Sequence, residues 1–139
     1  MDKPKVIKKL NQALERELTE VVKYMHQSFW VKGKGRRRLV NFFREQSRES
    51  MGHAIRLGEH IVGLGGNPVV RILEIYEPRK GSARRLLEQC VEDERAARDG
   101  YLKLLPLVQQ DKTLKRLVAG LAREEGAHIA QIQKMARRS

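Results

Sequence analysis

The sequence of 139 residues contains a single cysteine and no long apolar run, and both features restrict what the protein is. Cys90 alone cannot form an internal disulfide framework, so a reducing cytoplasm is the expected compartment. No apolar stretch approaches the length that crosses a bilayer, and the charged segment Met1-Asp2-Lys3-Pro4-Lys5 lacks an apolar signal core. We therefore expect a cytoplasmic protein with no membrane partner.

Strand signals and several catalytic motifs are also missing. The sequence shows no sustained alternation of apolar and polar residues, so strands are not expected. It carries no glycine-rich loop for phosphate and no cysteine set with zinc-ligand spacing, which leaves little support for the enzyme classes that depend on them. Helical periodicity dominates instead and predicts an all-α chain.

Acidic residues are outnumbered, with 17 Asp and Glu against 29 Lys and Arg, so the net charge is +12. Such an excess indicates nucleic acid, an acidic lipid or an acidic protein shell as a partner, while a solvated surface kept soluble by charge is the competing interpretation. Aromatic residues that could stack on bases make up only 5% of the chain. The basic clusters are Lys3 to Lys9, Lys32 to Arg38, Arg84 with Arg85, and Arg137 with Arg138.

Four helices are predicted, over residues 5–31, 36–64, 82–109 and from Asp111 onward, and Pro106 should end or bend the third early. The links at 33–35 and 109–112 are short, whereas residues 65–81 could run the length of a bundle. We therefore predict one domain over residues 1–139: a four-helix bundle with one long crossover between the second and third helices. An irregular loop with short helical pieces is the alternative for the crossover. The inward positions expected at the helix ends include Ile7, Met25, Leu64, Leu117 and Met135.

One polar pattern occurs twice along these helices. Glu17 and His53 are separated by 36 residues across the first turn, and Glu94 and His128 by 34 across the second. Glu125 lies three residues before His128, so the two share a helix face. All of these positions lie at about the same height in the bundle, and each interrupts an apolar stripe.

Convergence of these groups predicts a metal site. Buried carboxylates are costly without a cation, and a Glu on one helix with Glu-x-x-His on its partner, given twice, is the ligand pattern of a carboxylate-bridged di-metal centre. Carboxylates with imidazoles suit iron or manganese, and zinc stays open. A purely structural polar network is the alternative. The first copy departs from the pattern, because Ser50 stands where a Glu is expected.

Two segments resemble the bacterioferritins, members of the ferritin-like superfamily. They are residues 43–54, Phe-Arg-Glu-Gln-Ser-Arg-Glu-Ser-Met-Gly-His-Ala, and residues 123–129, Arg-Glu-Glu-Gly-Ala-His-Ile. The resemblance implies a ferritin-like bundle whose di-iron site oxidises Fe(II) with O2 or peroxide and passes ferric iron into a hollow cage. It also implies a ligand and catalytic set of Glu17, His53, Glu94, Glu125 and His128, with Glu94 and position 50 bridging the metals.

The resemblance further implies that Met51 is an axial ligand of haem b, shared with a second subunit across a twofold axis. Met51 is two residues from His53 and so faces away from the metal core. Val40, Phe43, Ser47 and Ala54 fall on a similar second face and suggest a dimer seam. The alternative is that Met51 only packs against a neighbouring subunit.

Three departures from the bacterioferritin pattern affect function. Ser50 offers a weak neutral oxygen, and Glu49 could replace it only if the helix bulged, because it is rotated by about 100°. The chain ends at Ser139, soon after the fourth helix, so no long fifth helix is expected and the cage size is open. The positive charge is unusual for an interior that attracts Fe(II).

Three functions follow from these observations. The leading hypothesis is a bacterioferritin-like ferroxidase that stores or detoxifies iron in a hollow homo-oligomer. The second is a haem-binding or scaffold subunit without ferroxidase activity. The third is a DNA-protecting, miniferritin-like protein whose N-terminal lysines and Arg36 to Arg38 contact phosphates.

Overall fold

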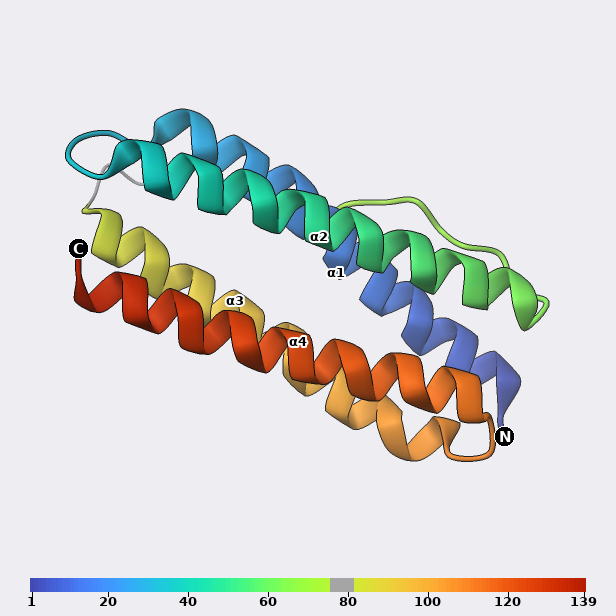
Figure 1. The fold of residues 1–139 in the computed structure, drawn as a ribbon. Coiled ribbons are helices and arrows are strands. Elements are labelled where there is room, and N and C mark those ends of the chain that lie inside the picture. Colours follow the sequence, from blue (N-terminus) through green and yellow to red (C-terminus); the bar gives the residue numbers. More distant parts are fainter. Residues whose placement is uncertain (76–81) are drawn as a thin grey trace. The chain divides into compact units, whose positions relative to one another are not determined.

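The computed structural model describes residues 1–75 and 82–139. In that part of the chain the order is α1 (Lys3–Trp30), α2 (Arg36–Gly63), α3 (Ala83–Leu104), the 3-10 helix η1 (Leu105–Val108) and α4 (Lys112–Arg137) (Figure 1). These residues form no strand, as predicted. None of the described helices is both long enough and apolar enough to cross a membrane. Contacts divide the chain into two compact units, residues 10–78 and residues 1–9 with 79–139.

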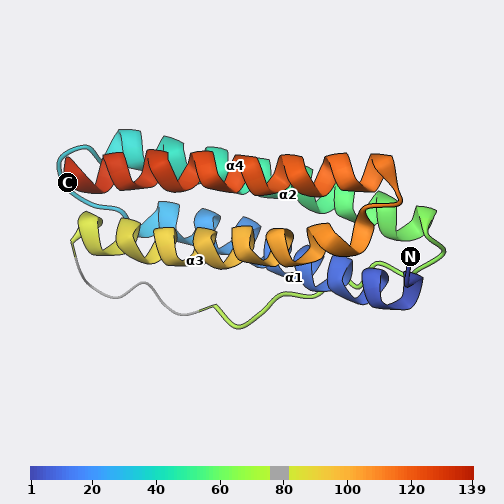
Figure 2. The ribbon, with the colours of Figure 1, turned by 90° about the horizontal axis from the view of Figure 1, so that it is seen from below.

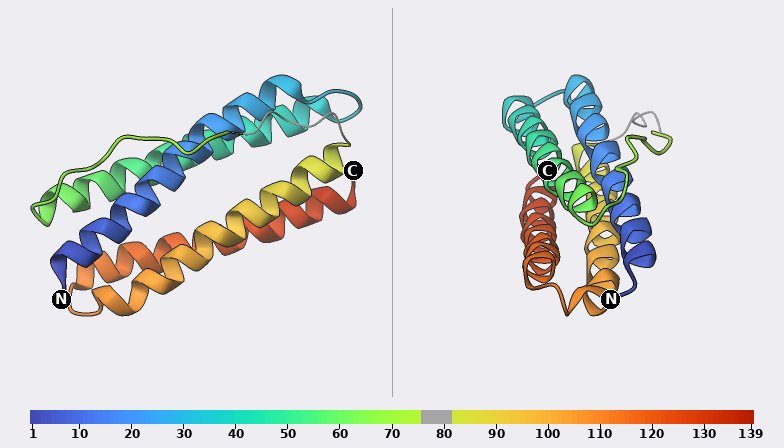
Figure 3. Two further views of the ribbon diagram at one scale, coloured as in Figure 1. Left: turned by 180° about the vertical axis from the view of Figure 1, so that it is seen from behind. Right: turned by 90° about the vertical axis from the view of Figure 1, so that its right-hand side faces the viewer.

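In the unit of residues 10–78, α1 and α2 form an antiparallel pair joined by a short link (Figure 3). Gly33 and Gly35 have φ angles of 87° and 81°, in the left-handed region that favours glycine, and so allow the tight reversal. Tyr24 and Phe43 are fully buried, with ring centroids 6.1 Å apart. The Ser47 hydroxyl donates to the Val21 carbonyl at 2.7 Å, which fixes the alignment of the two helices.

The beginning of the long crossover is fastened to the outer face of α1. The Asn11 side chain donates to the Asn67 carbonyl at 3.1 Å and accepts from the Val69 amide at 2.8 Å. The Thr19 hydroxyl accepts from the Leu73 amide at 2.8 Å. An ion pair between Arg71 and Glu15 lies between these two anchors. Figure 2 shows the segment running along the helix pair. Pro78, Lys80 and Gly81 of the predicted crossover lie outside the described residues.

In the second unit, α3 and α4 lie side by side (Figures 1 and 2). Pro106 ends the third helix early, as predicted: α3 stops at Leu104 and the chain continues as η1. Asp111 is the N-cap of α4, because its carboxylate accepts from the Leu114 amide at 3.0 Å. Cys90 is fully buried in the core of this unit.

Several predicted core positions were wrong. Val6, not Ile7, is buried at the start of α1, and Val118 is more deeply buried than Leu117 on α4. Leu64 and Met135 are only half-buried. Met25 is 44% exposed, although its spacing places it on the apolar stripe. The predicted seam beside Met51 also needs correction, because Val40, Phe43 and Ala54 are buried within the chain and are not available to a partner subunit.

Candidate metal centre

The first predicted half of the site lies between α1 and α2. Glu17 is 2% exposed and His53 5% exposed, and His53 Nδ1 lies 3.4 Å from Glu17 Oε2. Each residue therefore replaces an apolar side chain on the buried face of its helix. The antiparallel pairing brings the two together although 36 residues separate them in sequence.

Ser50 lies one turn before His53 and is buried, at 7% exposure. Its short hydroxyl occupies the position where the pattern expects a carboxylate. Glu49 is half-buried, and α2 runs as an uninterrupted α-helix through both residues. Without a bulge, Glu49 stays about 100° around the helix from Ser50. The α1–α2 half of the pattern therefore offers one carboxylate and one imidazole.

The second half lies between α3 and α4. Glu94 and Glu125 are each 3% exposed. His128 Nδ1 lies 3.9 Å from Glu94 Oε2 and 3.7 Å from Glu125 Oε2. One ligand atom from each of these three residues lies within 4.8 Å of the other two, so a single cation could contact all three. The short link from η1 into α4 and the three-residue spacing of Glu125 and His128 produce this convergence.

The chemistry of this set fits a divalent transition metal. Two carboxylates supply anionic oxygens and an imidazole supplies a neutral nitrogen, a mixture that suits iron and manganese. Burying two carboxylates in one place is costly, and a bound cation offsets the repulsion between them.

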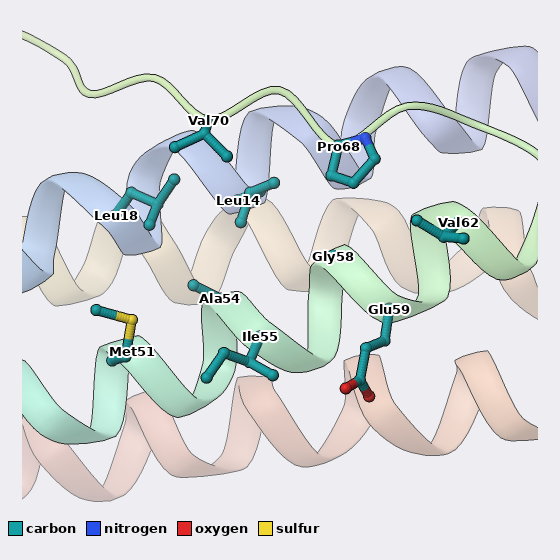
Figure 4. Close-up of a pocket in the computed structure, with 10 residues that line it drawn as sticks. All are labelled: Leu14, Leu18, Met51, Ala54, Ile55, Gly58, Glu59, Val62, Pro68 and Val70. Carbon is teal, nitrogen blue, oxygen red and sulfur yellow. The ribbon is translucent and has the colours of Figure 1, made fainter.

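Met51 is two residues from His53, about 200° around α2, and lies at an apolar pocket (Figure 4). It is 44% exposed and borders a cavity of about 460 Å³ between α1, α2 and the crossover. The lining is almost wholly aliphatic, and Glu59 is the charged side chain among the residues that form it. The other lining residues are Leu14, Leu18, Ala54, Ile55, Gly58, Val62, Pro68 and Val70.

Comparison with known families decides what this fold is. The model of the family described as "Ferritin-like domain" matches residues 7–138. The chain belongs to the ferritin family. The fold is therefore the predicted ferritin-like four-helix bundle, and the likeness of the chain to the bacterioferritins is confirmed.

Three solved structures resemble this ferritin in both sequence and fold. A ferritin-like diiron-carboxylate protein from Bacillus anthracis str. Ames is 26% identical, with a TM-score of 0.87 and 98% coverage of both chains. The dodecameric thioferritin of Bacteroides fragilis, described as bacterioferritin-related, is 26% identical with a TM-score of 0.89, over 96% of this chain and 85% of that chain. Rhodobacter capsulatus bacterioferritin, described with a metal-free dinuclear site and haem iron, is 28% identical with a TM-score of 0.84, over 96% of this chain and 84% of that chain.

Sequence reasoning identified every residue of the α3–α4 cluster in this ferritin but missed two other features. The anchors of the crossover, Asn11 and Thr19, gave no signal, because isolated polar residues on an outer helix face are common. The exposure of Phe29 and Trp30 at the end of α1, at 59% and 52%, was also missed. A gap in the acidic residues between Glu20 and Glu45 could have drawn attention to that region.

Proposed function

We propose that this ferritin is a ferroxidase that takes up Fe(II), oxidises it to Fe(III) and retains the product within an oligomer of its own chain. The observation that carries the proposal is the set of two buried carboxylates, Glu94 and Glu125, and half-buried His128, with one ligand atom of each within 4.8 Å of the others. Iron binding is the property that the family supports.

In this proposal Glu94, Glu125 and His128 would hold one Fe(II), and Glu17 with His53 would hold another. Bound Fe(II) supplies the electrons, one from each ion, and O2 with two protons accepts two electrons to give H2O2. The carboxylates stabilise the greater positive charge of Fe(III), and burial keeps bulk water from competing for the ligands.

Ser50 makes the two proposed iron sites unequal. A hydroxyl that keeps its proton is a much weaker ligand for iron than a carboxylate. The α3–α4 half has two carboxylates of its own, whereas the α1–α2 half has only Glu17. Iron should therefore bind more tightly to the half formed by Glu94, Glu125 and His128, and the second ion should bind more weakly.

Anaerobic titration with Fe(II), followed by exposure to air, tests the proposal. Calorimetry should show one tight Fe(II) site per chain and a second, weaker one. After exposure to air, the near-ultraviolet absorbance of Fe(III) should rise faster than in protein-free buffer. Two equal sites would contradict the effect assigned to Ser50. No saturable binding, together with oxidation at the buffer rate, would contradict the ferroxidase function itself.

Haem binding is a second candidate, favoured by the apolar pocket that Met51 borders (Figure 4). A thioether beside an aliphatic cavity suits the iron and the apolar face of a porphyrin. Two copies of the chain would each supply one Met51, which makes the ligand shared and the protein at least a dimer. This agrees with self-association among the bacterioferritin relatives.

Reconstitution with haem b is expected to give a Soret band that Met51→Ala removes. Met25→Ala is the matched control, because Met25 has the same 44% exposure, lies in the same unit and does not border the pocket. The control should keep the band. Equal spectra for both variants would show that haem, if it binds, does not use Met51.

A further inference from the structure

A long stretch around the link between α1 and α2 carries positive charge without any acidic residue. Between Glu20 and Glu45 the chain has seven Lys and Arg residues and no Asp or Glu. Five of the seven fall within residues 32–38, and all five are exposed. They are Lys32, Lys34, Arg36, Arg37 and Arg38. The repulsion among these charges destabilises the free protein, and a polyanion relieves it by bringing phosphates between them.

Two aromatic side chains stand beside these charges. Phe29 is 59% exposed and Trp30 52% exposed, at the last two positions of α1. Val31, the other apolar residue before the link, is buried. Between residues 29 and 38 the exposed apolar side chains are therefore two aromatic ones, Phe29 and Trp30. We call residues 29–38 the basic link (Figures 1 and 3).

Neighbouring side chains hold both rings in place. The Trp30 indole N–H donates to His26 Nε2 at 3.0 Å. The Arg44 guanidinium lies 6.0 Å from the centroid of the Phe29 ring, and its Nε donates to the Ser28 hydroxyl at 3.2 Å. Arg36 Nε donates to the Val31 carbonyl at 3.0 Å and so steadies the turn. Both rings are anchored and still exposed. Because their orientation is already restricted, less side-chain entropy is lost when a planar group stacks on them.

We propose that the basic link binds single-stranded nucleic acid, with phosphates paired to Lys34, Arg37 and Arg38 and a base stacked on Trp30. Cations that track a phosphate backbone beside an exposed aromatic ring are the combination by which proteins hold single strands without reading sequence. A lipid interface also accepts exposed Trp and Phe beside basic residues, so vesicles are the competing occupant in the experiment below. Duplexes hide their base faces, so they would gain only the charge interaction.

Trp30 is the only tryptophan of the chain, so its fluorescence reports on this surface alone. Oligothymidylate added to the full-length assembly at low salt should quench the emission and saturate. Polyphosphate, which has the charge without bases, should bind with little quenching. Phosphatidylglycerol vesicles should leave the emission unchanged. Quenching by vesicles but not by oligothymidylate would overturn the proposal in favour of a membrane surface. Trp30 emission that acrylamide cannot quench before any addition would show the ring buried between subunits and would also overturn it.

Matched variants separate the basic link from charge in general. Lys34→Ser, Arg37→Ser and Arg38→Ser, made together, should weaken binding of labelled oligothymidylate at least about tenfold and lower the salt slope by about 2. Lys5→Ser, Lys8→Ser and Lys9→Ser remove the same charge from the exposed start of α1 and should change binding little. Equal losses from the two triple variants would contradict a specific surface.

Stacking has its own test. Trp30→Leu keeps an apolar side chain and every charge, and it should weaken oligothymidylate binding about tenfold while leaving polyphosphate binding unchanged. Unchanged oligothymidylate affinity would show that only charge matters. Circular dichroism of each variant should match the unaltered protein, because every altered side chain is exposed. The outcome does not depend on iron, so the proposal stands or falls apart from the ferroxidase function.

Discussion

Glu94→Ala is expected to abolish tight iron binding. Glu94 is 3% exposed, and its Oε2 lies 3.9 Å from His128 Nδ1. The substitution removes one of the two carboxylates of the α3–α4 cluster. Removing an outer partner of a metal ligand already weakens affinity about 10- to 100-fold, so losing a direct ligand should exceed about 100-fold. Anaerobic calorimetry with Fe(II), or Co(II) absorbance under the same conditions, measures the change.

Glu92→Ala provides the control for this experiment. Glu92 lies on the same helix, is exposed, and forms an ion pair with Arg95 at 2.8 Å. The substitution removes the same charge from the unit and should leave iron affinity within about twofold, because exposed ion pairs contribute little. Iron should raise the melting temperature of the unaltered protein and of Glu92→Ala but not of Glu94→Ala. If both variants bind equally well, the cluster is not the site.

Ser50→Glu is expected to speed Fe(II) oxidation at least about tenfold, since a positioned carboxylate stabilises developing positive charge at the metal. Ser50 is buried one turn from His53, so the new carboxylate would join Glu17 and His53 on the same face. Stopped-flow absorbance after mixing the Fe(II)-loaded protein with air-saturated buffer gives the rate. The calorimetric difference between the two iron sites should also shrink.

Gly52→Glu is the matched control for Ser50→Glu. It also replaces a small neutral residue on α2 by a carboxylate, it is exposed, and an added Cβ there meets no atom within 4 Å. Its oxidation rate should equal that of the unaltered protein. An unchanged rate in Ser50→Glu would place position 50 outside the reach of the iron, and an equal gain in both variants would point to bulk charge.

The sequence predicted the helices and the clustering of Glu94, Glu125 and His128 because both depend on spacing along one helix or across one short turn. Glu125 and His128 share a face by periodicity alone, and Pro106 and Asp111 mark helix boundaries through local backbone chemistry. Periodicity could not determine exposure where another segment covers a helix. Met25 fits the apolar stripe yet is 44% exposed, whereas Thr19 lies off that stripe and is 8% exposed where the crossover passes over it.

The anchoring of the crossover changes which positions of α1 tolerate substitution. Outward positions on a helix usually accept most residues, but Asn11, Glu15 and Thr19 each bond a different part of residues 67–73. They are spaced four residues apart and so form a single line of attachment along the helix. Variation in this face of α1 is therefore restricted by the path of a distant segment, although none of the three residues belongs to the hydrophobic core.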